Sequence, residues 1–121
     1  MWIENNFYHI ISKEQKGEQS IYCIELHPDC SIYEGHFPEK PICPGVCMIE
    51  VIRECAALET GRQLLIQSIK QCRFINLISP EICKLLDVSL TLSPDGNGFG
   101  VKATVSDDQH MYVEYKGHMS I

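Results

Sequence analysis

The sequence predicts an α+β fold in which one antiparallel β-sheet curls around a single central helix. The first observation is the segment 46–58, a helical stretch whose apolar positions cover nearly its whole circumference. A helix this apolar is normally enclosed by other structure. The second observation is the order of elements, because β-rich segments both precede and follow this helix. A sheet wrapped around the helix satisfies both observations, and 121 residues with 45% hydrophobic content predict one domain over 1–121.

Two β-rich segments are expected before the helix, at residues 7–12 and 20–26. A polar stretch with a turn at Lys16-Gly17 separates them. Residues 34–45 contain three prolines and two glycines, so we expect an ordered loop without regular structure. Pro44 suits the start of the helix, where its missing N–H costs nothing.

The chain after the helix reads as β-structure. Gly61 suits the C-terminal cap of the helix. A hairpin loop is expected over residues 93–98, and Asp107-Asp108 predicts a further turn. An antiparallel sheet curled around one central helix is the hotdog fold. The predicted strands lie at 63–69 joined to 71–77, straight or bulged, and at 84–92, 99–105 and 111–120.

Charge and hydropathy exclude several classes of partner. The net charge of −6 argues against nucleic acid or an anionic membrane as the main partner. No apolar run is long enough to cross a membrane and the first residues lack a signal peptide, so we expect a cytoplasmic protein. A local basic patch could bind an acidic protein, although scattered solubilising charge explains the same residues. The candidates for such a patch are Lys40, Arg53, Arg62, Lys70 and Arg73.

Seven cysteines are present, an odd number, and no C-x-x-C pair occurs. Several lie in apolar runs, where a thiol packs as a small hydrophobic group. We therefore expect reduced thiols rather than a disulfide framework or a zinc site. Cys43 and Cys47 have no base beside them in sequence, so we expect packing roles for both.

The segment 35–50 carries the most chemistry. It places one imidazole, His36, in a Gly/Pro loop and one carboxyl group, Glu50, inside the apolar helix. Pro44-Gly45 forms a helix start whose backbone N–H groups are free to hold an oxygen. An imidazole, a carboxyl group and an N–H donor are the parts needed to move a proton next to a carbonyl group.

This segment resembles the signature of the bacterial 3-hydroxyacyl-(acyl carrier protein) dehydratases of the hotdog superfamily. The matching pattern is Gly-His-Phe-Pro-x-x-Pro-x-x-Pro-Gly-Val-x-x-x-Glu, with the family's own spacing between His36 and Glu50. Weaker similarity continues at Cys72-Arg73-Phe74 and Ser79-Pro80. Two positions depart from the family pattern: Glu54 stands where Gln is usual, and Glu81 stands where the family has Gly after Pro. Glu54 places a second carboxyl group near Glu50, which could raise the pKa of one of them.

The resemblance implies dehydration of a 3-hydroxyacyl thioester to a trans-2-enoyl thioester. His36 would be the base for the C2 proton, and Glu50, its pKa raised by burial, would serve the C3 hydroxyl. The N–H of Gly45 would bind the thioester carbonyl. The remaining residues expected at the substrate are Val46, Phe37 and Phe74, with Met48 and Ile49 as further candidates for the lining of the acyl tunnel, although core packing explains several of them equally well.

The resemblance also implies partners. The substrate would arrive on the phosphopantetheine arm of an acyl carrier protein, and no bound metal or cofactor is implied. The active unit would be a homodimer, or a trimer of such dimers, in which His36 of one chain faces Glu50 of the other. An unpaired sheet edge agrees with such pairing.

Two alternatives remain open. A hotdog thioesterase also binds acyl thioesters at a helix N-terminus but does not require His36. A non-catalytic acyl-carrier-binding subunit would explain Glu54 as a sign of a decayed site. Glu50 and Arg53 would then be an ordinary i,i+3 pair at the solvated edge of the helix.

Overall fold

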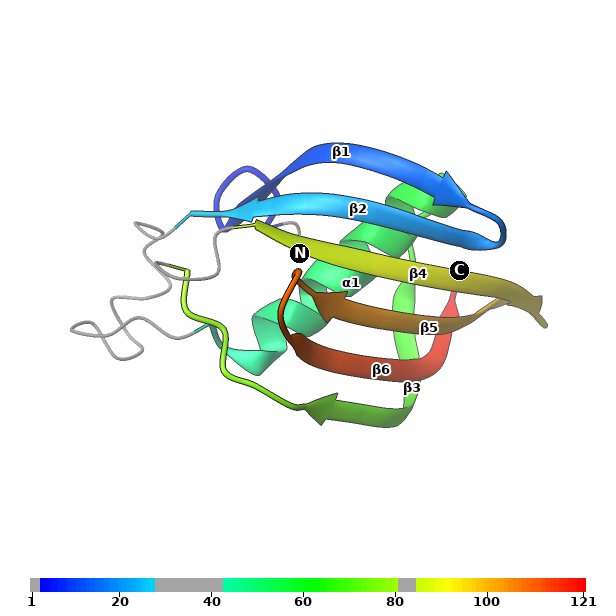
Figure 1. The fold of residues 1–121 in the computed structure, drawn as a ribbon. Coiled ribbons are helices and arrows are strands. Elements are labelled where there is room, and N and C mark those ends of the chain that lie inside the picture. Colours follow the sequence, from blue (N-terminus) through cyan, green and yellow to red (C-terminus); the bar gives the residue numbers. More distant parts are fainter. Residues whose placement is uncertain (1–2, 28–42, 81–84) are drawn as a thin grey trace.

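A computed structural model describes residues 3–27, 43–80 and 85–121 of the chain. One helix, α1 (Gly45–Thr60), lies against one face of a curved antiparallel sheet (Figure 1). The predicted hotdog arrangement of a sheet around a central helix is confirmed. The strands are β1 (Tyr8–Lys16), β2 (Gln19–Leu26), β3 (Leu65–Phe74), β4 (Leu85–Asp95), β5 (Gly98–Ser106) and β6 (Met111–Ser120).

The strand order across the sheet is β1-β2-β4-β5-β6-β3, and every neighbouring pair is antiparallel. The first strand after the helix, β3, therefore lies at the far edge, next to the last strand. Its pairing with β6 shifts register twice, between Ile66 and Ser68 and between Ile69 and Gln71. The option of a bulged strand is the one observed, and the bulges increase the local bend.

The core lies between α1 and the inner face of the sheet. Alternate residues of β2 and β4 are buried, as a strand with one face on a core requires. The helix contributes Met48, Val51, Ile52 and Cys55, each at most 1% exposed. Gly61 ends the helix in the left-handed region, with φ 68°, as the sequence predicted.

β1, β4 and β5 are longer than predicted. β1 continues through the polar residues to Lys16, because these residues pair with the start of β2. β4 and β5 extend until only Gly96 and Asn97 form the turn, with Gly96 at φ 63°. In both places backbone pairing along a neighbouring strand overrides the weak local β-propensity of polar residues.

The two edges of the sheet differ in character. The outer residues of β1 are mostly charged or polar, whereas β3 and the segment that follows it expose large apolar side chains. Within the described ranges, α1 is too short and too interrupted by charge to serve as a membrane-spanning helix. The exposed apolar side chains near β3 are Leu65, Ile69, Phe74, Ile75 and Leu77.

Candidate functional site

The N-terminus of α1 presents backbone N–H groups without a side-chain cap. Pro44 is the N-cap residue and makes no side-chain hydrogen bond. Its carbonyl oxygen accepts hydrogen bonds from the N–H groups of Cys47 and Met48, at 3.0 and 3.4 Å. The N–H groups of Gly45 and Val46 precede these and have no intrahelical acceptor available. This end of the helix can therefore bind an oxygen that carries partial negative charge.

Phe74 lies over this helix start. A Cβ atom placed on Gly45 would lie 2.8 Å from Cζ of the Phe74 ring, closer than normal contact allows. Glycine at position 45 thus lets the ring approach the helix backbone. Phe74 is 52% exposed and Val46 is 74% exposed, so this corner of the molecule is open. The structure brings together three predicted substrate-binding residues: Gly45, Val46 and Phe74.

Glu50 lies in the second turn of α1 and is held by Arg53. The Nε of Arg53 donates to both carboxylate oxygens of Glu50, at 3.0 and 3.2 Å, and Nη2 donates to Oε2 at 2.5 Å. The side chains of Arg53 and Glu50 are only 10% and 17% exposed. The Nη1 of Arg53 donates to the backbone oxygen of Leu64 at 3.0 Å. The pair is an i,i+3 contact as expected, but it is not at a solvated edge of the helix.

Glu54 is completely buried, and its two oxygens accept hydrogen bonds from the N-terminal turn, which comprises residues 3–8 and ends at the first residue of β1. Oε2 accepts from the N–H of Ile3 at 2.6 Å. Oε1 accepts from the N–H of Glu4 and the hydroxyl of Tyr8, both at 3.0 Å. The Nη2 of Arg53 lies 4.0 Å from Oε2. A buried carboxyl group with three hydrogen-bond donors is part of the folded structure, and these contacts explain why glutamate stands at this position.

The pKa values of Glu50 and Glu54 shift in opposite directions. Burial alone would raise the pKa of Glu50, but hydrogen bonds from Arg53 and Glu54 outweigh it, so its pKa is lowered. The expectation of a raised pKa at Glu50 is therefore wrong. Burial, strengthened by the hydrogen bond with Glu50, raises the pKa of Glu54 to about 7. The second carboxyl group does raise the pKa of one partner, and that partner is Glu54.

The structure does not place all of the predicted residues at the site. His36, Phe37 and Lys40 lie outside the described residues, so the convergence of His36 on Glu50 stays a prediction. Met48 is 1% exposed and belongs to the core, and Ile49 is partly buried against it. Arg53 cannot serve in a basic docking patch, because Glu50 and Leu64 engage it.

Several thiol and imidazole groups lie outside this pair of carboxyl groups. Cys23, Cys43, Cys47, Cys55 and Cys72 are free cysteines among the described residues. Burial raises the pKa of Cys55 to about 12. His9 and His27 contact each other, with Nδ1 of His9 2.7 Å from Nε2 of His27. They lie 18 residues apart in sequence, and only the pairing of β1 with β2 brings them together.

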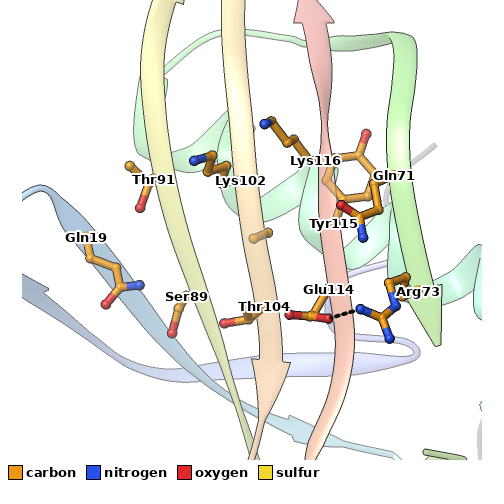
Figure 2. A pocket seen from close by; sticks show the side chains of 11 residues that line it. Gln19, Gln71, Arg73, Ser89, Thr91, Lys102, Thr104, Glu114, Tyr115 and Lys116 are labelled. Atoms are coloured by element: carbon orange, nitrogen blue, oxygen red, sulfur yellow. Dashed lines mark hydrogen bonds and ion pairs between the residues drawn. The ribbon is translucent and has the colours of Figure 1, made fainter. Parts of the chain in front are cut away.

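A polar pocket lies on the outer face of the sheet, away from α1 (Figure 2). Figure 2 shows Lys102 and Lys116 side by side there, as their direct cross-strand register requires. Arg73 forms an exposed ion pair with Glu114 at 3.4 Å. The lining includes none of the residues that the sequence assigned to the substrate. This face therefore has no part in the candidate site.

Sequence reasoning missed the roles of Arg53 and Glu54. The i,i+3 spacing of Glu50 and Arg53 was visible, but it did not indicate burial. The partners of Glu54 lie 46 to 51 residues away in the chain, at Ile3, Glu4 and Tyr8. No local pattern carries that information.

Comparisons with known proteins agree with this architecture. Curated relatives include 3-hydroxyacyl-(acyl-carrier-protein) dehydratase FabZ of Clostridium acetobutylicum, 29% identical over 113 residues, which covers 86% of this chain and 79% of that protein. FabZ of Geobacillus sp. (strain WCH70) is 29% identical over 103 residues, with 78% and 70% covered.

Solved structures show the same fold. The dehydratase heterocomplex ApeI:P from Xenorhabdus doucetiae superposes with a TM-score of 0.73 at 20% identity, covering 93% of this chain and 96% of that one. The dehydratase domain from the CurJ module of curacin polyketide synthase gives 0.59 at 17% identity, covering 93% and 41%. The model of the ApeI-like family, described as ApeI dehydratase, matches residues 12–115. That match spans most of the sequence, and the chain belongs to the ApeI-like dehydratase family.

Proposed function

We propose that this protein dehydrates (3R)-hydroxyacyl groups on an acyl carrier protein to trans-2-enoyl groups, in fatty-acid or related lipid or polyene biosynthesis. The observation that carries the proposal is the placement of Glu50. Its ionised, arginine-held carboxylate lies one turn from a helix start that offers the uncapped N–H groups of Gly45 and Val46. Membership in a dehydratase family supports the same reaction.

In the proposed mechanism the thioester carbonyl accepts a hydrogen bond from the N–H of Gly45. Negative charge that develops on this oxygen as C2 loses its proton is stabilised by the helix N-terminus. His36 takes the C2 proton, and a neutral imidazole is suited to this at physiological pH. The C3–O bond then breaks and the electron pair of the C2–H bond becomes the new double bond.

Glu50 acts as a hydrogen-bond acceptor in this scheme. Because its pKa is lowered, it orients the C3 hydroxyl through that group's own O–H and does not supply a proton. The departing hydroxide needs one proton to leave as water. The imidazolium of His36, which has just taken a proton from C2, is the group that carries it.

We propose that the active unit pairs two hotdog chains through the β3 edge. β3 pairs with β6 on one side, and no other strand in the described ranges covers its second side. The apolar side chains exposed there, led by Leu65 at 68% and Leu77 at 75%, are of the kind that interfaces bury. The partner is a second copy of this chain or a homologous hotdog subunit, as the ApeI:P heterocomplex illustrates for a neighbour in fold.

The test is turnover of carrier-bound 3-hydroxyacyl chains of several lengths, followed by mass spectrometry and ultraviolet absorption of the enoyl product. We expect loss of one water per acyl chain in the native protein and no product in H36A. Release of a free thiol without an enoyl product would identify a thioesterase instead. Tight carrier binding without any product, in the homodimer and with a homologous partner, would identify a non-catalytic subunit.

A further inference from the structure

We propose that Arg53 is a positioning residue for Glu50, which it orients and keeps ionised, and that Glu54 ties this arginine to the N-terminal turn. The inference rests on the proposed function, since it assigns Glu50 a role toward the substrate. It adds two residues that the sequence resemblance does not assign, one of which departs from the family pattern.

The first support is the geometry of the guanidinium group. Three N–H···O contacts of 2.5 to 3.2 Å join Arg53 to the two oxygens of Glu50. Two contacts of this kind define the plane of a carboxylate, which a single lysine ammonium cannot do. Glu50 is therefore held in one orientation before a substrate arrives.

The second support is that Arg53 is itself anchored. Its Nη1 donates to the carbonyl oxygen of Leu64, which lies just before β3 and is 0% exposed. The guanidinium thus bridges α1 and the entry to β3. A side chain fixed at both ends loses little freedom when it binds a carboxylate, so its geometry is preorganised.

The residue at position 54 must accept three hydrogen bonds from the N-terminal turn. Both oxygens of Glu54 accept hydrogen bonds from this turn, Oε2 from Ile3 and Oε1 from Glu4 and Tyr8. A glutamine side chain has one acceptor oxygen and would turn an NH₂ group toward at least one of these donors. The turn therefore favours a carboxyl group at position 54, and Nη2 of Arg53 lies 4.0 Å from one of its oxygens.

The titratable groups around this unit come from two elements. Glu50, Arg53 and Cys55 face Glu54 from α1, and Glu4 and Tyr8 face it from the N-terminal turn. Arg53 is the one cation among them within the described residues. Its removal takes away the hydrogen bonds and the positive charge that lower the pKa of Glu50 and leaves the burial that opposes ionisation, so the pKa of Glu50 must rise.

The experiment compares R53Q and R53K with the native protein over the full pH range of the dehydratase assay. We expect R53Q to lower kcat about tenfold or more, with KM within about threefold, because the lost contact acts on the reacting geometry. The acid limb of the pH–rate profile of R53Q should steepen from a one-proton to a two-proton dependence. Glu50 must then lose a proton together with His36 before the enzyme is active. R53K should keep the native slope of the acid limb, but its kcat should be lower than that of the native protein.

The matched control is E59Q on the same helix. Glu59 also accepts from a tyrosine hydroxyl and a cation, Tyr22 and Lys13, but it lies toward the opposite end of α1 from Gly45. Its variant should leave the slope of the acid limb and kcat unchanged. Superimposable profiles for R53Q and E59Q, or native kcat in R53K, would overturn the positioning role.

A second readout does not depend on turnover. Carboxyl ¹³C NMR of glutamate-labelled protein, with Glu50 assigned through E50Q, follows its titration directly. We expect the pKa of Glu50 to rise by about one unit or more in R53Q relative to the native protein, and to stay low in R53K. An unchanged titration of Glu50 refutes the inference even if the protein dehydrates its substrate. Absence of turnover in the native protein removes the proposed function and leaves this test intact.

Discussion

Glu54 and Glu59 lie on the same helix and accept similar sets of hydrogen bonds, but their pKa values shift in opposite directions. Glu59 accepts from Ser20 at 2.7 Å, from Tyr22 at 2.9 Å and from Lys13 at 2.8 Å. Burial opposes ionisation of Glu59, but these contacts outweigh it and lower its pKa. Glu54 has three hydrogen-bond donors as well, yet its pKa is raised to about 7.

The difference lies in exposure and in the second carboxyl group. The side chain of Glu59 is 20% exposed, whereas that of Glu54 is 0% exposed. Glu54 also shares a hydrogen bond with Glu50, and two carboxyl groups in contact do not both ionise easily. Hydrogen bonds therefore satisfy a buried carboxyl group without fixing its charge, which burial and the neighbouring carboxyl group decide.

The largest expected difference between the two ends of the helix is catalytic. We expect E50Q to lower kcat/KM about 10²- to 10⁴-fold, because the amide cannot orient the C3 hydroxyl as a carboxylate does. E59Q should stay within about twofold of the native protein. Steady-state kinetics on the same carrier-bound substrate measure both. Equal activities in the two variants would contradict the assignment of the site to the Gly45 end of α1.

The next largest effect is the pH dependence of stability. A raised pKa means that folded Glu54 keeps a proton that the unfolded chain releases between the ordinary pKa of 4.5 and about 7. The native protein should therefore lose stability relative to E54Q as pH rises through this window, by up to about 3 kcal/mol. Urea unfolding at pH 5 and pH 8 measures the difference, and an increase with pH would contradict the raised pKa.

Glu59 should show the opposite sign in a different window. Its lowered pKa means that its contacts stabilise the protein above the ordinary pKa of 4.5 and are lost as pH falls below it. The advantage of the native protein over E59Q should thus shrink on acidification, by about 1 kcal/mol or less because the group is partly exposed. Urea unfolding at pH 6 and pH 3.5 follows this, and a constant difference would show that the Lys13 and tyrosine contacts do not favour the ionised form.

The smallest effect is expected at the helix start, where no carboxyl group is involved. In G45A the new methyl group would displace the ring of Phe74, which is half exposed and able to move. We expect less than about 1 kcal/mol change in unfolding free energy, together with a several-fold rise in KM. Urea unfolding and kinetics on one preparation separate the two, with F74A as the companion variant. A native KM in G45A would show that Phe74 does not need to lie over the helix backbone.

The sequence by itself determined the succession of strands along the chain and the burial of α1, but not the place of β3 at the far edge of the sheet. The succession and the burial follow from apolar periodicity and from Gly and Pro positions, which are local signals. It also placed Glu50 in the second turn of the helix and Gly45 at its start, because a helix begun at Pro44 leaves little choice of position.

Only the tertiary structure decided the charge of the candidate site. The contacts of Glu54 with Ile3 and Tyr8, the anchoring of Arg53 on Leu64, and the approach of Phe74 to Gly45 all join residues from different elements. A pKa depends on burial and on every charge within a few ångströms. Local sequence does not specify those distances, so the helix and its glutamates were predictable, whereas the ionised state of Glu50 was not.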